Sequence, residues 1–112
     1  MSSIRPILAA FTCAATIAIA ATTVNGAPER SGEAVYEANC ANCHSGGFGG
    51  FFTGAPKVGK QKDWETLEAK GIGTLTANTI NGFGEMAPRA ECAVCTDEEI
   101  RAAVEYMVEQ SQ

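Results

Sequence analysis

Apolar residues in this chain recur at helical rather than strand spacing. The clearest stripe lies close to the C-terminus and consists of Ile100, Ala103, Val104, Met107 and Val108. Thr96, followed three residues later by Glu99, has the pattern of a capping box at the start of this segment. We therefore expect a final helix that buries the stripe, with Met107 in the core.

Two shorter helices are expected earlier in the chain. The first begins at Ser31 and runs to a Cys-His motif that ends at residue 44. The second follows Asp63, which is placed to cap residues 64–70 before Gly71 ends the helix.

A further helix and a long loop complete the predicted domain. Residues 74–80 form the further helix and offer Leu75 and Ile80 to a core. Residues 45–62 are dense in Gly and Pro, which predicts a loop without regular structure. Because no segment shows the period-two alternation of a strand, the sequence predicts an all-α domain of about four helices.

Residues 1–27 have the pattern of a secretory signal peptide. Arg5 supplies a positive start, residues 7–24 carry no charge, and the small residues that end at Ala27 suit cleavage there. An uncleaved membrane anchor is the alternative, but the stretch is rich in Ala and Thr rather than in Leu and Phe. We expect cleavage, which removes Cys13 with the signal, and export to the periplasm or an equivalent space.

Size and charge limit the functions that residues 28–112 can have. A domain this small gains limited stability from burial alone, so a covalent staple is expected. The chain carries 13 acidic against 8 basic residues. This acidic excess argues against nucleic acid as a partner.

The chain contains one Cys-x-x-Cys-His motif, Cys40-Ala41-Asn42-Cys43-His44. Two thiols at this spacing add to the two vinyl groups of haem, and the adjacent imidazole reaches the iron. A thioredoxin-like pair would need a βαβ setting, and a zinc site would leave His44 unused. The motif therefore predicts one covalent haem c held by Cys40 and Cys43, with His44 as an axial ligand of the iron.

The second axial ligand must be another kind of group, because His44 is the only histidine. Methionine, a weaker group such as lysine, or water can fill that position. Met86 lies in a connection between two expected helices, close to a proline, whereas Met107 lies on an apolar stripe where methionine usually packs. We assign Met86 to the iron.

Two further residues are expected beside the haem. The remaining ring N–H of His44 needs an acceptor, for which the carbonyl group of Pro56 is the candidate. Trp64 is expected either to donate its indole N–H to a haem propionate or to pack on the haem edge with that N–H bonded elsewhere.

Three blocks of sequence carry a family resemblance over most of residues 30–110. They are the Cys40–His44 motif, Gly54–Gly59 followed by Trp64, and the stretch from Met86 to Val108. Together they resemble the class I cytochromes c, and within them the short cytochrome c5-like group. The resemblance implies a class I cytochrome c fold around one haem, and a function in electron transfer.

The resemblance also implies a disulfide between Cys92 and Cys95, just ahead of the final helix. Thr96 stands where a second haem motif would need histidine, which agrees with a structural pair. In this family the first and last helices cross, and a glycine there admits an aromatic ring. The matching residues in this chain are Gly32, Tyr36 and Tyr106.

The sequence departs from the family pattern at two places. Residues 46–53 lengthen the loop that follows the haem motif, and Ala87 separates Met86 from Pro88. The aromatic residues of the enlarged loop are Phe48, Phe51 and Phe52. We expect them to cover the haem edge, the alternative being an exposed apolar patch for docking.

Basic residues are expected around the haem crevice, and they are Lys57, Lys60, Lys62, Lys70 and Arg89. They either steer a partner with an acidic face or are simply solvated.

The expected function is that of a soluble, exported monohaem one-electron carrier without catalytic residues. Its partners would be redox proteins such as a quinol-linked reductase and a terminal oxidase or reductase. A haem-bearing subunit, or an open-site haem enzyme or gas sensor, is the alternative if Met86 is not a stable ligand. We expect a monomer or weak dimer that meets membranes only through its partners or through an uncleaved signal.

Overall fold

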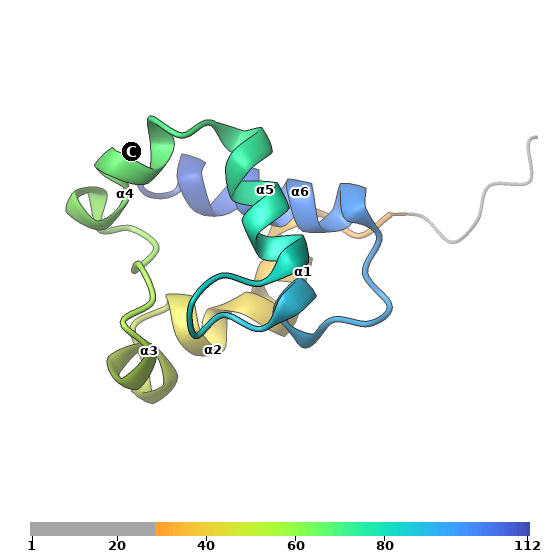
Figure 1. The fold of residues 1–112 in the computed structure, drawn as a ribbon, viewed down its shortest axis with the longest axis horizontal. Coiled ribbons are helices and arrows are strands. Elements are labelled where there is room, and N and C mark those ends of the chain that lie inside the picture. The colour runs from red at the N-terminus through yellow and green to blue at the C-terminus, as the bar shows by residue number, and fades with distance from the viewer. Residues whose placement is uncertain (1–28) are drawn as a thin grey trace, which may run out of the picture.

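Helices account for the regular structure of residues 29–112, the part of the chain that the computed structural model describes. In chain order the elements are α1 (Gly32–Val35), the π-helical η1 (Tyr36–Cys40), α2 (Ala41–His44), α3 (Phe48–Thr53), α4 (Gln61–Glu68), α5 (Ile72–Asn81), the 3-10 helix η2 (Pro88–Glu91) and α6 (Asp97–Glu109) (Figure 1). Extended pairing within these residues is limited to one isolated bridge between Phe83 and Met86. The all-α prediction is confirmed, whereas the predicted signal segment with Cys13 lies outside the described residues.

The first predicted helix is present and continuous through three elements, from α1 through η1 to α2. The side chain of Ser31 caps it by accepting a hydrogen bond from the backbone N–H of Ala34 at 3.2 Å. The π-helical stretch ends at Cys40, directly before the turn that carries Cys43 and His44. Such π-helical segments are frequent at functional sites.

The last helix, α6, supplies most of the core. All five residues of the predicted stripe are buried: Ile100, Ala103, Val104, Met107 and Val108. The capping box formed by Thr96 and Glu99 is also present. The sequence prediction for this helix is therefore confirmed.

The first and last helices cross at Gly32. A Cβ atom there would overlap the backbone carbonyl of Ala102, so only glycine allows this approach. The rings of Tyr36 and Tyr106 pack beside the crossing with their centroids 5.3 Å apart.

The prediction of a loop over residues 45–62 is wrong in part, because residues 48–53 form α3. The glycines of this segment allow close packing between helices and do not prevent regular structure. A Cβ at Gly49 would lie 2.8 Å from the carbonyl oxygen of Asn42, and one at Gly50 would overlap the carbonyl of Cys43. These two glycines let α3 lie directly against α2.

The phenylalanine side chains of α3 point to solvent and do not pack into the domain interior. Phe48, Phe51 and Phe52 are 83%, 81% and 69% exposed. The expectation that they cover the haem edge is therefore wrong, and the alternative of an exposed apolar patch is what the structure shows. With the glycine face of α3 turned to α2, the aromatic face points outward.

Two middle helices differ in detail from the prediction. α4 begins at Gln61, so Asp63 lies in its first turn instead of capping it. There Asp63 accepts a hydrogen bond from the backbone N–H of Lys57 at 3.1 Å and pairs with Lys60 at 2.9 Å. α5 extends the predicted segment at both ends, and Leu75 and Ile80 pack against the core while remaining partly exposed.

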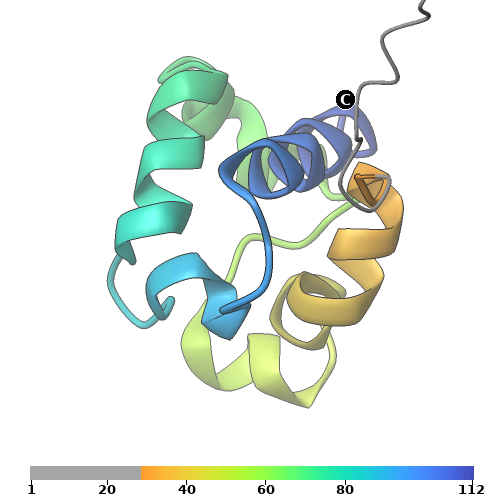
Figure 2. The same cartoon turned by 90° about the vertical axis from the view of Figure 1, so that its right-hand side faces the viewer.

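The helices are arranged around a common interior. Figure 2 shows α6 lying across the molecule between α5 on one side and the run from α1 to α2 on the other, with η2 facing that interior. Among the described residues, no helix is both long and apolar enough to cross a membrane.

Candidate haem site

A cavity of about 500 Å³ lies between α2, α4, α5, α6 and the loop that follows α5. Its volume falls in the range of roughly 300–1,000 Å³ that is usual for cofactor and ligand sites. The structure brings all the predicted site residues to its wall: Cys40, Cys43, His44, Pro56, Trp64 and Met86. Residues from both ends of the domain therefore meet at one place.

His44 is buried at the end of α2 with its ring orientation fixed. Its Nδ1 lies 2.8 Å from the carbonyl oxygen of Pro56, and because that oxygen only accepts, Nδ1 carries the proton and donates it. The backbone carbonyl of His44 accepts a second hydrogen bond from Val58 at 2.8 Å. In the neutral imidazole with this hydrogen bond, the lone pair is on Nε2, which is the form of histidine that binds metals.

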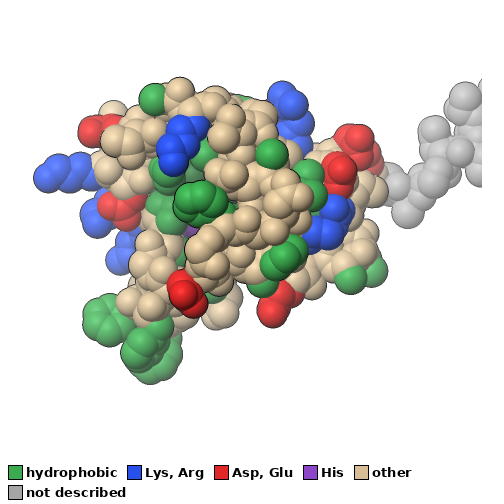
Figure 3. All heavy atoms as spheres, viewed as in Figure 1, with side chains coloured by type: hydrophobic (Ala, Val, Ile, Leu, Met, Phe, Trp, Pro, Cys, Tyr) green, Lys and Arg blue, Asp and Glu red, His purple; other side chains and the backbone are tan. Residues whose placement is uncertain are grey.

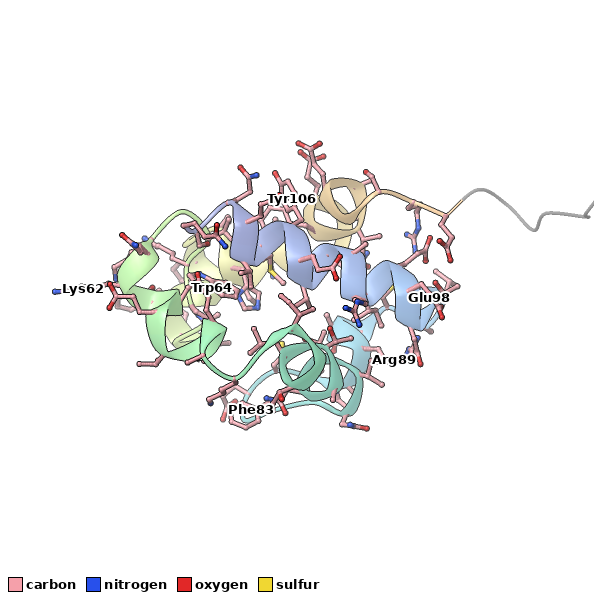
Figure 4. The ribbon with its side chains drawn as sticks, turned by 90° about the horizontal axis from the view of Figure 1, so that it is seen from above. Lys62, Trp64, Phe83, Arg89, Glu98 and Tyr106 are labelled. Carbon is pink, nitrogen blue, oxygen red and sulfur yellow. A yellow bond between two sulfur atoms is a disulfide. The ribbon has the colours of Figure 1, made fainter. Side chains whose placement is uncertain are left out.

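Trp64 is buried, and its side chain forms part of the cavity wall (Figure 4). Its indole N–H donates to the carbonyl oxygen of Lys57 at 2.8 Å. Of the two roles that the sequence left open, this geometry corresponds to a ring packed at the site with its N–H bonded elsewhere. The ring centroid lies 6.2 Å from that of His44, so the indole also backs the imidazole.

The two cysteines of the motif are free thiols on one short helical stretch. Their three-residue spacing places them on the same side of the helix. Cys40 is buried and Cys43 is partly exposed. Burial raises the pKa of the Cys40 thiol to about 11, so this thiol is neutral at pH 7.

Met86 reaches the cavity from the loop between α5 and η2. Paired hydrogen bonds of 3.0 Å between the backbones of Phe83 and Met86 close this loop. Met107 also lines the cavity from α6, although it is buried in the core as predicted. Two thioethers therefore lie at the cavity wall, one on a loop and one on the core helix.

Three consecutive residues after Pro88 adopt left-handed backbone conformations without glycine. The φ angles of Arg89, Ala90 and Glu91 are 57°, 49° and 60°. Such conformations cost free energy for residues that carry a Cβ, and they persist where the surroundings hold them. Nothing in the sequence indicated this turn, because residues of this type rarely adopt it.

Comparison with known proteins gives a consistent result. Residues 27–107 match the family model described as cytochrome c oxidase, cbb3-type, subunit III. Cytochrome c-555 of Chlorobaculum tepidum is 40% identical over 86 residues, which span 73% of this chain and 76% of the relative. Cytochrome c5 of Azotobacter vinelandii is 38% identical over 84 residues, which span 73% of this chain and 96% of the relative. The chain belongs to the cytochrome c family.

Solved structures agree with this assignment. A mono-heme ferrocytochrome c from Shewanella putrefaciens aligns with a TM-score of 0.62 at 37% identity, covering 77% of this chain and all of that chain. A chain of the electron transfer complex of nitrite reductase with cytochrome c aligns with a TM-score of 0.66 at 34% identity, covering 72% of this chain and 94% of that one. Together with the c5 and c-555 relatives, these matches confirm a class I, c5-like cytochrome with one covalent haem c that carries electrons.

The residues around the cavity fit this haem. Two free thiols, an imidazole with an available Nε2 and a thioether share its wall. The remaining wall includes Leu67, Leu75 and Val104, which suit the apolar faces of a porphyrin. The donor set contains soft sulfur and imidazole nitrogen, the ligands typical of haem iron in cytochromes.

A polar cluster that the sequence did not reveal anchors the N-terminus of the domain to α6. The guanidinium of Arg30 donates to Glu99 at 2.8 and 2.9 Å and lies 3.1 Å from Sγ of Cys95. Glu99 also accepts hydrogen bonds from the backbones of Arg30 and Thr96, both at 3.0 Å. The hydrogen bonds from Arg30 and Thr96 lower the pKa of the Glu99 carboxyl to about 2.

Cys92 and Cys95 lie beside this cluster and are joined by a disulfide, with their Cα atoms 5.4 Å apart. Both are buried at the start of α6. Arg89 crosses the same turn and donates to the carbonyl oxygen of Cys95 at 2.6 Å and to Asp97 at 2.7 Å. The short segment before α6 is therefore held from several sides.

Proposed function

We propose that Cys40 and Cys43 form the thioether bonds to the haem, and that Nε2 of His44 and the sulfur of Met86 are the axial ligands of its iron. The observation that carries this proposal is the meeting of the four side chains at one cavity, with Nδ1 of His44 engaged by Pro56. The haem, when bound, supplies one iron that gains or loses a single electron.

The chain's own residues set the conditions for that exchange. The hydrogen bond to Pro56 fixes the imidazole and raises its basicity as a ligand. A thioether from Met86 favours ferrous iron and so raises the reduction potential. Trp64, Leu75 and Val104 line the cavity with apolar surface, which keeps water from the iron.

We propose that the protein is a carrier and not an enzyme. A haem enzyme needs an open iron position with an acid or base above it, and Met86 would fill that position. An open-site enzyme or gas sensor remains the alternative if Met86 leaves the iron. The charged side chains at the cavity wall are Lys70, Glu85 and Glu91, and none is buried.

The finer setting is also part of the proposal. Residues 1–27 would be a cleaved signal peptide, and the mature chain would work in the periplasm as a monomer or weak dimer. Its donors and acceptors would be a quinol-linked reductase and a terminal oxidase or reductase. One structural relative occurs in a complex with nitrite reductase, which supports a redox protein as partner. We propose that the Cys92–Cys95 disulfide is a structural staple.

An absorption spectrum of the purified oxidised protein tests the ligand assignment. We expect the weak far-red band that reports methionine sulfur on ferric haem, and no reaction of the reduced protein with carbon monoxide. Absence of the band together with carbon monoxide binding would remove Met86 from the iron and return catalysis or sensing as the function. Mass spectrometry of the same sample reports the N-terminal residue, the covalent haem and the disulfide.

A further inference from the structure

α3 has the reverse of the usual amphipathic orientation. Its glycines face the protein and its phenylalanines face solvent. Phe48, Phe51 and Phe52 occupy positions i, i+3 and i+4, so they share one face of the helix. Water-exposed aromatic residues in such a cluster normally mark an interaction surface.

The three rings form one cluster that stands out from the molecule. Phe52 contacts Phe48 with centroids 4.8 Å apart and Phe51 with centroids 5.4 Å apart. Figure 3 shows this hydrophobic group over α3, projecting beyond the rest of the surface. The surface is convex, and α3 is supported from the protein side by the contact of its glycines with α2.

The stretch of sequence that carries the cluster has no acidic residue, although Asp63 follows it directly and pairs with Lys60 at 2.9 Å. No Asp or Glu occurs from residue 38 to residue 62, although the chain carries 13 of them. The same stretch contains Lys57, Lys60 and Lys62. The side chain of Lys57 lies against Gly46 in the turn that leads into α3.

Lys62 lies at the opposite end of the molecule from the acidic first turn of α6, where Arg30 and Arg89 pair with Glu99 and Asp97. Figure 4 shows Lys62 at the end that carries α4, and Glu98 at the opposite end, at the start of α6. Asp97, Glu98 and Glu99 all lie in that first turn of α6. Although α4 also carries Asp63, Glu65 and Glu68, the lysines at this end would be drawn to a negatively charged surface more than the acidic start of α6 would be.

We propose that α3 inserts Phe48, Phe51 and Phe52 into the headgroup region of an anionic lipid bilayer, with Lys57 and Lys62 contacting the lipid phosphates. A projecting apolar tip with a basic border has the composition of interfacial membrane anchors. The binding is peripheral and reversible, since only three side chains enter the lipid.

Two other occupants fit the observations less well. A second copy of this chain would bring the lysines of both copies together across a two-fold interface, where they repel. A redox protein would need a pocket that receives the projecting tip. Weak electron-transfer complexes instead use contacts that bury small areas. A fluid bilayer accepts a convex tip without a preformed pocket.

The inference does not depend on the iron ligands, and it replaces the expectation that the protein meets membranes only through its partners or through an uncleaved signal. Thr53 and Gly54, at the end of α3, line the haem cavity. A protein held by α3 would thus keep its haem cavity close to the lipid surface, where membrane-bound redox proteins are found.

Sedimentation of the haem-loaded protein with sucrose-filled vesicles tests the proposal, with haem absorbance as the measure of bound protein. We expect binding to phosphatidylcholine vesicles that contain a quarter phosphatidylglycerol, and at least fivefold weaker binding to pure phosphatidylcholine. Replacing all three phenylalanines by serine should lower binding to the anionic vesicles at least tenfold. Each variant is compared with the wild type after mass spectrometry has shown that both carry the same N-terminal residue.

Matched controls separate the patch from general surface effects. Val94 is as exposed as Phe48, at 83%, but lies between the paired cysteines, so Val94→Ser should bind like the wild type while Phe51→Ser binds severalfold more weakly. Lys57→Gln with Lys62→Gln should weaken binding, whereas Arg101→Gln on α6 should not. The absorption spectrum of each variant reports that its haem site is intact.

Three results would overturn the proposal. The first is a wild-type protein that stays in solution with both kinds of vesicle. The second is a triple-serine variant that binds as well as the wild type. The third is a dimer, detected by sedimentation equilibrium and lost in the triple variant, without vesicle binding, which would assign the patch to a second copy.

Discussion

The guanidinium of Arg89 lies 2.6 Å from the carbonyl oxygen of Cys95 and donates a hydrogen bond to it. The same side chain pairs with Asp97 at 2.7 Å. Arg89 stands three residues after Met86, so this one contact ties the loop that brings Met86 to the cavity to the start of α6.

We expect Arg89→Gln to lower the free energy of unfolding by about 1–2 kcal/mol, because hydrogen bonds from a charged donor contribute roughly that amount. Urea unfolding followed by circular dichroism measures the change. Arg89→Lys keeps the charge but not the forked geometry, and should recover only part of the loss. Equal stability of the wild type and Arg89→Gln would show that the contact does not hold the loop.

The left-handed turn offers a stabilising substitution. Ala90 has a φ of 49°, which costs a residue with a Cβ roughly 1–2 kcal/mol but costs glycine nothing. After the entropy that glycine loses on folding, Ala90→Gly should raise the free energy of unfolding by about 0.5–1 kcal/mol. The same change at Ala34, a helical position in α1, should lower it by about 1 kcal/mol. A loss of stability in Ala90→Gly would mean that the turn is not left-handed in solution.

The two thioethers at the cavity wall can be told apart by substitution. Met86→Ala should remove the far-red absorption band and lower the reduction potential, because the soft ligand of ferrous iron is lost. Met107→Leu conserves volume in the core and should cost less than about 1.5 kcal/mol without altering the band. Absorption and potentiometry of both variants measure the outcome. Loss of the band in Met107→Leu alone would make Met107 the ligand.

The lowered pKa of Glu99 predicts a specific loss of stability in acid. Its pKa is lowered to about 2 in the folded protein from an ordinary value of 4.5, chiefly by the hydrogen bond from Arg30. A carboxyl with a lowered pKa stabilises the fold above its unfolded pKa, and this contribution is lost as the pH falls toward the folded pKa. The contribution of Glu99 should therefore be complete above pH 4.5 and decline between pH 4.5 and 2.

Glu99→Gln tests this response because glutamine does not titrate. The variant should be less stable at pH 7, and its stability should fall less steeply than that of the wild type between pH 4.5 and 2. Thermal unfolding across this range gives both curves. Glu105→Gln is a suitable control, since Glu105 is exposed on the same helix and pairs with the exposed Arg101. Parallel curves for Glu99→Gln and the wild type would contradict the assignment.

Local spacing predicted those parts of the molecule whose chemistry or packing is itself local. The Cys-x-x-Cys-His motif and the stripe of α6 need only neighbours in sequence, and the structure has both where they were expected. The prediction that Met86 meets His44 followed from the count of possible ligands and from the place of Met86 in a loop near a proline. No periodicity in the chain brings these two residues together.

The parts that could not be predicted depend on distant contacts. The density of glycines before Gly54 indicated a loop. The sequence does not reveal that Gly49 and Gly50 face the carbonyls of α2 and so allow a packed helix. Arg30 and Glu99 are 69 residues apart, so only the fold shows their pairing. The left-handed conformation at Ala90 is imposed by its surroundings against the preference of the residue.

Arg30, Arg89 and the disulfide all end within the few residues from Cys95 to Glu99. Two separate segments, the entry to α1 and the Met86 loop, are therefore attached to the start of α6. Segments that share their attachments open as a cooperative unit rather than one by one. Amide protons of the Met86 loop and of the entry to α1 should accordingly exchange with solvent at similar rates, although these segments lie far apart in the sequence.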